Sequence, residues 1–292
     1  MLNYEMFKNE VIENLVSYLP SEYRNSTVRT FATEKVNVTY ETIVVDLKGR
    51  NNSPSLYLDE FYKRYLDTMD EEAVIKEMAE IVVEVTKTMP PVIKVNLDDM
   101  KDHIVPQIIN TKKNEKLLSQ VPHKEFLDLS IIYRVLIPNQ NCSSEEDDVQ
   151  ASAIITNSLL EDSSIEANDL FEIALKNSER DFPATFMKLH LLCPMIVVSK
   201  GLENSWGAST ILYHDVFRKL AEELDDDLVM IPSSTHEWIV QPKRICDPDM
   251  MQSIFYSIED VNKTVLPDTD FLSDHPYLYC KETGVVSCIE NK

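Results

Sequence analysis

The sequence predicts an α+β fold, with a mixed, mostly antiparallel sheet and several packed helices. Segments with apolar residues four apart, typical of amphipathic helices, are interspersed with short segments rich in Val, Ile, Thr and Tyr. The order of these segments does not follow the strict βαβ alternation of a parallel sheet. With 292 residues, of which 43% are hydrophobic, the chain is long enough for a sizeable core in one or two domains.

The N-terminal region predicts helices on either side of two strands. Phe7, Val11 and Leu15 lie four apart, which indicates a helix over residues 3–18 that ends before Pro20. The next expected elements are the strands Val28–Lys35 and Asn37–Leu47, a helix around 59–68, and a long helix with Asp70 as its N-cap. The apolar stripe of the long helix consists of Val74, Met78, Ile81, Val82 and Val85.

The middle of the chain predicts mainly strands. Ile104–Ile109 is expected at the edge of a sheet, because Pro106 cannot donate a backbone hydrogen bond to a neighbouring strand. Phe126–Ile137 has the strongest strand pattern of the first half and is expected to form one long strand. The other expected elements are a short strand at Val92–Val95, a helix at Asn114–Gln120 and a strand at Val149–Leu160.

The C-terminal region predicts three helices and two hairpins. Leu212, Val216 and Leu220 lie four apart and are expected to face the core from a helix over 208–224. The other helices are expected near 166–178 and after Asp249, which we expect to be the N-cap. The expected strands are a buried one at Pro194–Ser199, a hairpin of Leu228–Ile231 with Glu237–Gln241, and a hairpin of Tyr277–Tyr279 with Val285–Cys288.

Acidic residues are concentrated in the second half of the chain. The whole chain has 50 acidic and 28 basic residues, which gives a formal net charge of −22. Residues 1–138 carry a net charge of −5, and residues 139–292 carry −17. A polar stretch rich in turn formers begins after Pro138. We therefore expect an N-terminal α+β half, 1–138, and an acidic C-terminal α+β half, 139–292, either as two domains or as one continuous domain.

The composition excludes several classes of function. Only 4 residues are Gly, and neither GxGxxG nor GxxxxGK[ST] occurs, so phosphate-binding loops of these types are absent and no cofactor is expected. A surface this negative repels nucleic acid and anionic membranes, so neither is expected as a direct partner. A protein partner with a basic surface is compatible with the charge, whereas the oligomeric state cannot be predicted.

The N-terminus, the apolar runs and the cysteines of the chain predict a cytoplasmic protein. The N-terminus has no basic segment followed by an apolar stretch, and the longest apolar run, Leu191–Val198, is too short to span a bilayer. The five cysteines are an odd number, widely spaced and without a CxxC. This pattern predicts reduced thiols rather than a disulfide framework or a zinc knuckle.

The segment 232–249 contains the candidate residues for chemistry. His236 and Glu237 are neighbours at a predicted turn, where a histidine can act as an acid or a base. Together with Asp247 and Asp249 they could also hold a metal ion. The pair does not belong to an HExxH zinc site, because position 240 is Val and the segment predicts a turn and a strand. These four residues therefore stay candidates, and no residue is assigned as catalytic or as a metal ligand.

Two patterns near the candidate site are similar to those of a known family. From Gly207 the sequence follows G-A-x-x-[IL]-x-Y, and from Ile231 it follows I-P-S-S-x-H-E-x-I-x-x-P, which includes both His236 and Glu237. In these patterns the chain resembles a bacterial family of unknown function that is common in anaerobic Gram-positive bacteria. Residues 55–67 and 104–137 are similar to the same family, so the resemblance covers nearly the whole chain. It implies no activity.

The function that the sequence favours is a soluble, non-enzymatic, acidic interaction protein that binds a protein partner. One alternative is an enzyme or metal-dependent module centred on residues 232–249. Another is an acidic decoy that mimics nucleic acid and blocks a protein that binds it. Convergence of His236, Glu237, Asp247 and Asp249 in one pocket would favour the metal-dependent module, and a flat acidic face would favour the other two.

Overall fold

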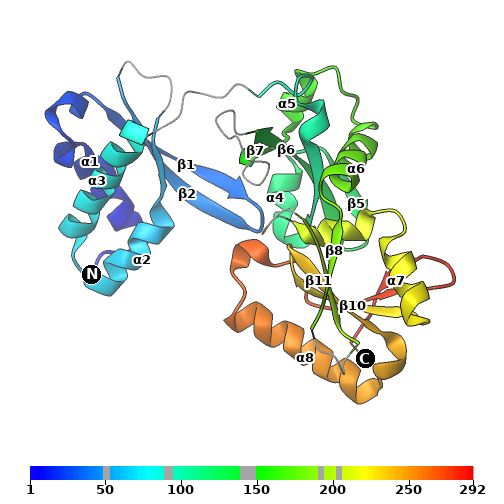
Figure 1. Ribbon diagram of the computed structural model, residues 1–292. Coiled ribbons are helices and arrows are strands. Elements are labelled where there is room, and N and C mark those ends of the chain that lie inside the picture. The colour runs from blue at the N-terminus through cyan, green and yellow to red at the C-terminus, as the bar shows by residue number, and fades with distance from the viewer. Residues whose placement is uncertain (49–52, 89–94, 139–148, 190–193, 202–205, 292) are drawn as a thin grey trace. The chain divides into compact units, whose positions relative to one another are not determined.

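The computed structural model describes residues 1–48, 53–88, 95–138, 149–189, 194–201 and 206–291 (Figure 1). Contacts divide the chain into two compact units, which are described here one after the other. The first consists of Met1–Lys35 and Thr39–Val95, and the second of Val36–Val38 and Asn96–Lys292. Both contain helices and antiparallel strand pairs, which confirms the α+β class.

The predicted boundary between residues 138 and 139 adjoins a stretch, 139–148, that lies outside the described residues. The strands on its two sides are β6 (Leu129–Pro138) and β7 (Val149–Ile154), which pair antiparallel in one sheet of the second unit. Contacts divide the two compact units near Val95.

In the first unit, three helices pack against a sheet with the strand order β1-β2-β3 (Figure 1). The elements are α1 (Tyr4–Tyr18), β1 (Thr27–Lys35), β2 (Val38–Asp46), β3 (Ser55–Tyr57), α2 (Leu58–Thr68) and α3 (Glu71–Thr88). The four-residue spacing of Phe7, Val11 and Leu15 puts these side chains in the core. Val74 and Met78 of α3 belong to the same core, so both helix stripes are confirmed.

The second unit begins with a sheet in the order β4-β6-β5, with β7 paired to β6. Its elements are β4 (Ile104–Asn110), α4 (Glu115–Leu118), β5 (His123–Phe126), β6, β7, α5 (Asn157–Glu161) and α6 (Leu170–Asp181). Within the described ranges β4 pairs with β6 alone, so the edge position predicted from Pro106 is confirmed. Asn177 of α6 ties the helix to β4, because its side-chain amide donates to the Ile104 carbonyl at 3.0 Å.

The strand predicted at Phe126–Ile137 is confirmed as β6 over most of its length, but it begins at Leu129, because a tight turn precedes it. β5 ends at Phe126 and β6 begins at Leu129, so Leu127 and Asp128 form the turn. Leu127 has a φ of 58° and is 47% exposed. Of the two turn residues only Asp128 is of a type typical of turns, and the apolar Leu127 fits the pattern of a strand.

Other expected elements of this region also differ from the structure. The strand predicted at Val149–Leu160 ends at Ile154, because Thr156 caps the short helix α5 by accepting from the Leu159 backbone N–H at 3.2 Å. The helix predicted near 166–178 occupies Leu170–Asp181. Most of the short strand predicted at Val92–Val95 lies outside the described residues.

A second sheet of the second unit has the strand order β13-β12-β10-β11-β9-β8. The strands are β8 (Ala184–Lys188), β9 (Ile196–Lys200), β10 (Leu228–Ser234), β11 (Glu237–Pro242), β12 (Tyr277–Tyr279) and β13 (Val286–Cys288). Both predicted hairpins, β10–β11 and β12–β13, are confirmed. Ile254 and Ile258 of the helix α8 (Pro248–Thr264) pack on Val229 of β10.

The single helix predicted over 208–224 is wrong. A 3-10 helix covers Gly207–Leu212, and α7 covers Val216–Leu224, with Asp215 between them at a φ of 64°. Tyr213 stands at the interruption, and its hydroxyl donates to the Phe182 carbonyl at 2.9 Å. This contact with a residue far away in the sequence accompanies a break that the local apolar spacing did not predict.

Two further predictions concern thiols and membranes. Cys246, Cys280 and Cys288 are free, as expected for reduced thiols, whereas Cys142 and Cys193 lie outside the described residues. In the described ranges, none of the helices has the length and apolar character of a membrane-spanning segment.

Candidate functional site

The first two candidate residues lie at the β10–β11 turn. The Nδ1 atom of His236 accepts a hydrogen bond from the Trp206 backbone N–H at 3.2 Å, and its Nε2 atom lies 3.5 Å from Asp270 Oδ1. Glu237 accepts a hydrogen bond from the Ser233 hydroxyl at 3.0 Å. His236 and Glu237 therefore have separate partners, although they are neighbours in the sequence.

The other two candidate residues begin the helix α8. Asp247 is the N-cap, and its carboxylate accepts from the Met250 backbone N–H at 2.8 Å. Asp249, which we expected to be the cap, lies in the first helical turn, where an acidic side chain is favoured by the helix dipole. Both positions are explained by helix stability alone.

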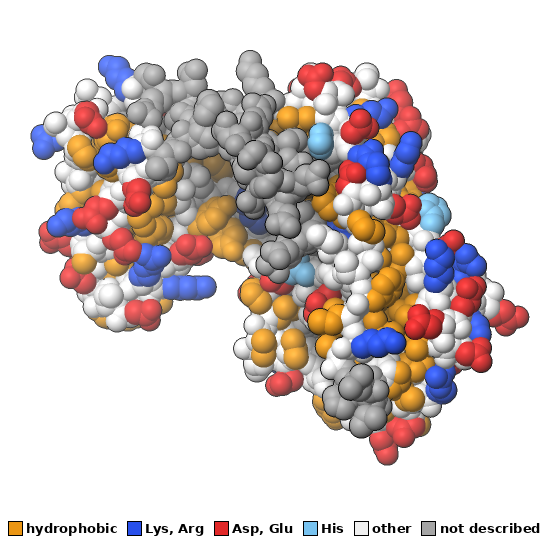
Figure 2. Space-filling model, in the orientation of Figure 1, with side chains coloured by type: hydrophobic (Ala, Val, Ile, Leu, Met, Phe, Trp, Pro, Cys, Tyr) orange, Lys and Arg blue, Asp and Glu red, His pale blue; other side chains and the backbone are white. Residues whose placement is uncertain are grey.

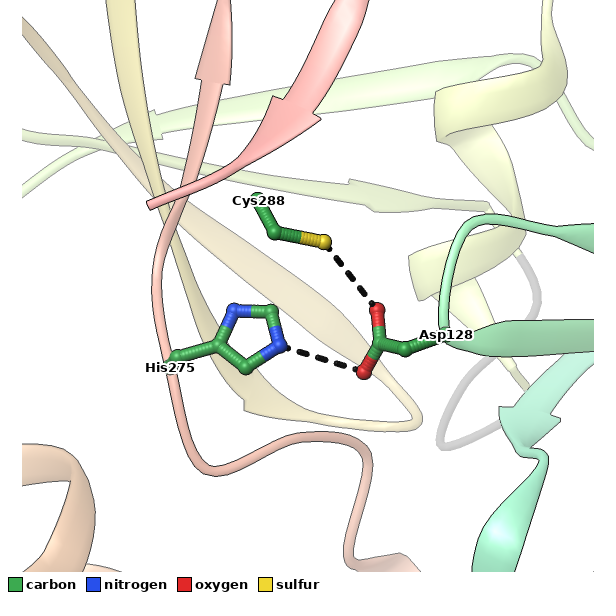
Figure 3. Close-up of side chains that lie close together, drawn as sticks. All are labelled: Asp128, His275 and Cys288. Carbon is green, nitrogen blue, oxygen red and sulfur yellow. Dashed lines mark hydrogen bonds and ion pairs between the residues drawn. The ribbon is translucent and has the colours of Figure 1, made fainter. Parts of the chain in front are cut away.

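A different set of three side chains lies close enough to hold a metal ion. Among the described residues, the potential ligand atoms of Asp128, His275 and Cys288 all lie within 4.8 Å of one another. Figure 3 shows Cys288 and His275 pointing toward the two carboxylate oxygens of Asp128. The Nε2 atom of His275 is 3.2 Å from Asp128 Oδ2, and the Cys288 thiol is 3.5 Å from Asp128 Oδ1.

Three separate parts of the second unit bring this site together. Asp128 is in the turn between β5 and β6, and His275 lies just before β12. Cys288 ends β13, where it pairs with Tyr277 across the β12–β13 hairpin. His275 and Asp128 are partly buried, with 22% and 36% of their side chains exposed, so solvent ions can reach the site.

Neighbouring groups hold the Asp128 and His275 side chains in position. The Tyr277 hydroxyl donates to Asp128 Oδ1 at 2.8 Å. On the other side of the imidazole, His275 Nδ1 lies 3.1 Å from the Pro276 carbonyl oxygen. A histidine whose Nδ1–H donates to a backbone carbonyl presents the lone pair of Nε2, which is the arrangement found in histidines that bind metals.

Without a metal ion, the same contacts determine the protonation of the site. The hydrogen bond to Asp128 raises the pKa of His275 above its ordinary value. Burial acts to raise the pKa of Asp128, but hydrogen bonds from His275 and Tyr277 outweigh burial and lower that pKa. Burial and the Asp128 carboxylate raise the pKa of Cys288 to about 11. The thiol is therefore protonated at neutral pH, which argues against Cys288 as an activated nucleophile.

A pocket of about 470 Å³ is lined by sequence neighbours of two of these residues, but by none of the three themselves. Its lining includes Leu127, which directly precedes Asp128, and Val286, which lies two residues before Cys288 on the same face of β13. The remaining wall combines aromatic side chains with Arg218 and with the acidic residues Glu125 and Asp215. A pocket of this volume can accommodate a small molecule.

Sequence reasoning missed all three residues of the site. Cys288 and Tyr277 belong to a hairpin that the sequence predicts, so their pairing could have been derived from its register. Asp128 lies within the segment predicted as a strand, Phe126–Ile137, and is 147 positions away from His275 in the sequence. Nothing in the local pattern of the sequence joins positions so far apart.

The comparisons with known proteins identify a family. A model described as "Family of unknown function (DUF5688)" matches residues 4–281, a range that includes Asp128 and His275 and ends before Cys288. Neither the curated proteins nor the solved structures contain a match to the chain. The family model spans most of the 292 residues, and the chain therefore belongs to this family of unknown function, DUF5688.

Proposed function

We propose that this protein binds a divalent transition metal ion of the zinc type through Asp128, His275 and Cys288. The observation that carries the proposal is the convergence of a carboxylate, an imidazole and a thiol from three distant segments. Zinc is the metal that proteins most often bind with this combination of oxygen, nitrogen and sulfur ligands. Calcium and magnesium prefer oxygen ligands alone, so they fit this site less well.

The distances in the site support the proposal. Bonds of about 2.0–2.1 Å to nitrogen or oxygen and about 2.3 Å to sulfur leave the ligand atoms of a tetrahedral zinc ion about 3.3–3.8 Å apart. The contacts of 3.2 Å between His275 and Asp128 and 3.5 Å between Cys288 and Asp128 are close to this spacing. Small side-chain movements therefore suffice to admit the ion.

Three protein ligands leave a fourth position of a tetrahedral ion open. Structural zinc sites have four protein ligands, whereas catalytic sites keep one position for water or substrate. The open position favours a site at which water or a small molecule reaches the metal. The metal-dependent module that the sequence placed at residues 232–249 is thus proposed at another part of the second unit.

Titration of the metal-free protein with Co²⁺ tests this proposal. We expect one ion per chain and a sulfur-to-cobalt charge-transfer absorption, because Cys288 becomes a thiolate ligand. Cys288→Ser should lose this absorption, whereas Cys280→Ser, a matched change at another free thiol, should keep it. Absence of the band in the wild-type protein, or an unchanged band in Cys288→Ser, would rule out the site.

We also propose that the protein binds a protein partner with a basic surface. The excess of acidic residues, 50 against 28 basic ones, supports this proposal. Figure 2 shows acidic side chains interspersed with Lys and Arg on the face in view, so the charge attracts a partner over a broad area rather than at one point. An affinity pulldown from host lysate at two salt concentrations tests it, since captured basic proteins should dissociate at high salt.

Competition distinguishes this interaction from the decoy alternative. A captured protein that DNA or RNA displaces would make the chain a mimic of nucleic acid, whereas a partner that keeps its binding would favour an ordinary protein interface.

We further propose a cytoplasmic location and a family range in anaerobic Gram-positive bacteria. The free thiols of Cys246, Cys280 and Cys288 support the location, because reducing compartments preserve thiols.

A further inference from the structure

Lys200 is a buried lysine at the end of β9, with only 4% of its surface exposed. In the part of the chain that the structure describes, its Nζ atom has no hydrogen-bond partner. A buried ammonium group without a partner destabilises a fold, and proteins therefore rarely keep one without a reason. The position of Lys200 therefore calls for an explanation other than packing.

A second cation, Arg134, lies against the ring of Trp206, which is also near Lys200. The guanidinium carbon of Arg134, on β6, lies 4.4 Å from the centre of the Trp206 ring. The Lys200 Nζ atom is 6.0 Å from that ring and 5.8 Å from the ring of Phe182. Contacts with ring faces stabilise cations, but they do not neutralise charge.

The hydrogen bonds of Arg134 go only to neutral groups. Its Nε and Nη2 atoms donate to the Ser152 hydroxyl at 3.2 and 3.0 Å, and Nη1 donates to Gln107 Oε1 at 3.2 Å. A guanidinium has five N–H groups, so these three bonds leave two for a further acceptor. Within the described ranges, no carboxylate forms an ion pair with either Arg134 or Lys200.

The desolvation of both cations has a measurable consequence. Burial lowers the pKa of Arg134 to about 10 and that of Lys200 to about 7. Arg134 is therefore charged at neutral pH, Lys200 is protonated in part, and an anion beside Lys200 favours its charged form. An anion would supply the negative charge that the surrounding protein does not provide.

We propose that Arg134 and Lys200, whose cationic groups both lie over the Trp206 ring, form a binding site for a small oxyanion, such as a carboxylate or a phosphate. Arg134, Ser152 and Trp206 are half-buried, so an anion can reach the Arg134 side chain from solvent. The site shares no residue with Asp128, His275 and Cys288, and its test is independent of the metal proposal. An oxyanion site on a chain of net charge −22 requires local cations such as these two.

Two residues of the family-like patterns hold Trp206 in place. The Trp206 backbone N–H donates to His236 Nδ1 at 3.2 Å, and the residue has a φ of 52°. Gly207 is the next residue in the chain. Its backbone lies so close to the β10–β11 turn that a Cβ atom there would be 2.1 Å from the His236 carbonyl oxygen. His236 thus holds the Trp206 backbone beside the oxyanion site.

Thermal unfolding in different anions tests the proposal. Phosphate, sulfate, acetate and citrate are compared with NaCl at matched ionic strength, because chloride reports screening alone. At a concentration 100 times the dissociation constant, the bound anion should raise the melting temperature by about 5–10 °C, and the increase should saturate. A shift with phosphate and sulfate only, or with the carboxylates only, identifies which oxyanion class the site takes.

Variants assign the shift to this site. Lys200→Met and Arg134→Gln should each remove the saturable shift, whereas Lys188→Met, a change at a lysine with 72% side-chain exposure, should retain it. The melting curve of each variant without added oxyanion shows directly that it is folded. Fluorescence gives a second readout, because Trp206 is one of only two tryptophans and the other, Trp238, is buried apart from solvent.

Two results would overturn the proposal. One is a wild-type protein that responds to oxyanions and to chloride alike. The other is a saturable shift of equal size in the wild-type protein and in the folded Lys200→Met and Arg134→Gln variants.

Discussion

Lys200 shows how burial of a single residue makes the stability of the whole protein depend on pH. Burial lowers its pKa to about 7 in the folded protein, against 10.5 for an exposed lysine. Between these two values the unfolded chain binds one more proton than the folded protein, so stability increases with pH in this window. Below about pH 7 both states carry the proton, and Lys200 adds no further dependence on pH.

Replacement of Lys200 by Met should remove this contribution. We expect the free energy of unfolding of the wild-type protein, relative to Lys200→Met, to increase by about 1.4 kcal/mol per pH unit between about pH 7 and pH 10. Urea unfolding at several pH values measures the difference, and other titrating groups cancel between the two proteins. Parallel stability curves for wild type and variant would show that Lys200 is not a desolvated lysine.

Gly207 provides a residue-scale test of the contact that holds Trp206. A methyl group at this position would lie 2.1 Å from the His236 carbonyl oxygen and 2.2 Å from Ser199 Oγ, so the backbone has to shift. We expect Gly207→Ala to lower the free energy of unfolding by about 1–3 kcal/mol and to change Trp206 fluorescence. Gly201→Ala is the control, since open space surrounds Gly201 apart from a 4.0 Å contact. Equal stability of both variants contradicts the close approach.

The candidate residues show which parts of a site a sequence can reveal. The role of His236 as a turn residue follows from the hairpin that the polar segment 232–236 predicts. Asp128 could not be identified, because the neighbouring Leu127 made its turn resemble a strand. Lys200 follows four buried or half-buried strand residues, and its burial depends on Phe182 and Trp206, which the local sequence does not place beside it.

At the scale of secondary-structure elements, strong periodic patterns predicted the fold and tertiary contacts caused the exceptions. The helix stripe with Phe7 and Val11 and the β10–β11 hairpin were predicted correctly, because their patterns repeat over several turns or residues. The helix expected over 208–224 is interrupted where the Tyr213 hydroxyl bonds to the Phe182 carbonyl. A sequence window of this length contains no information about such a partner.

The helix α7 allows a direct test of this corrected assignment. Phe217 is 3% exposed, whereas Val216, on the apolar stripe expected from the sequence, is only half-buried. We expect Phe217→Asp to cost about 3 kcal/mol or more, because it buries an unpaired charge, and Val216→Asp to cost clearly less. Urea unfolding gives both values. A greater loss for Val216→Asp than for Phe217→Asp would restore the continuous helix.

At the scale of the whole molecule, the excess of acidic residues makes stability sensitive to ions. A net charge of −22 is self-repulsive, and added salt screens exposed charges within about 10 Å at 0.1 M. The net charge follows from the composition alone, whereas the proposed metal site depends on the positions of three residues in space. For this reason the sequence predicts general electrostatic behaviour, whereas it does not predict the position of this site.

A melting series separates screening from specific binding. NaCl should raise the melting temperature gradually, whereas Zn²⁺ at micromolar concentration should raise it saturably and far more than NaCl of equal ionic strength. The Zn²⁺ effect should be absent from His275→Ala and present in His214→Ala, a matched change at an exposed histidine. A response to Zn²⁺ that is equal in both variants would assign the binding to other groups.

X-ray absorption at the zinc edge tests the proposed metal centre most directly, because it reports the atoms bonded to the ion. For the protein loaded with one equivalent of Zn²⁺, we predict one sulfur ligand at about 2.3 Å and nitrogen or oxygen ligands at about 2.0–2.1 Å. The sulfur should disappear in Cys288→Ser and remain in Cys280→Ser. A spectrum with nitrogen and oxygen ligands alone in the wild-type protein would contradict a centre formed by Asp128, His275 and Cys288.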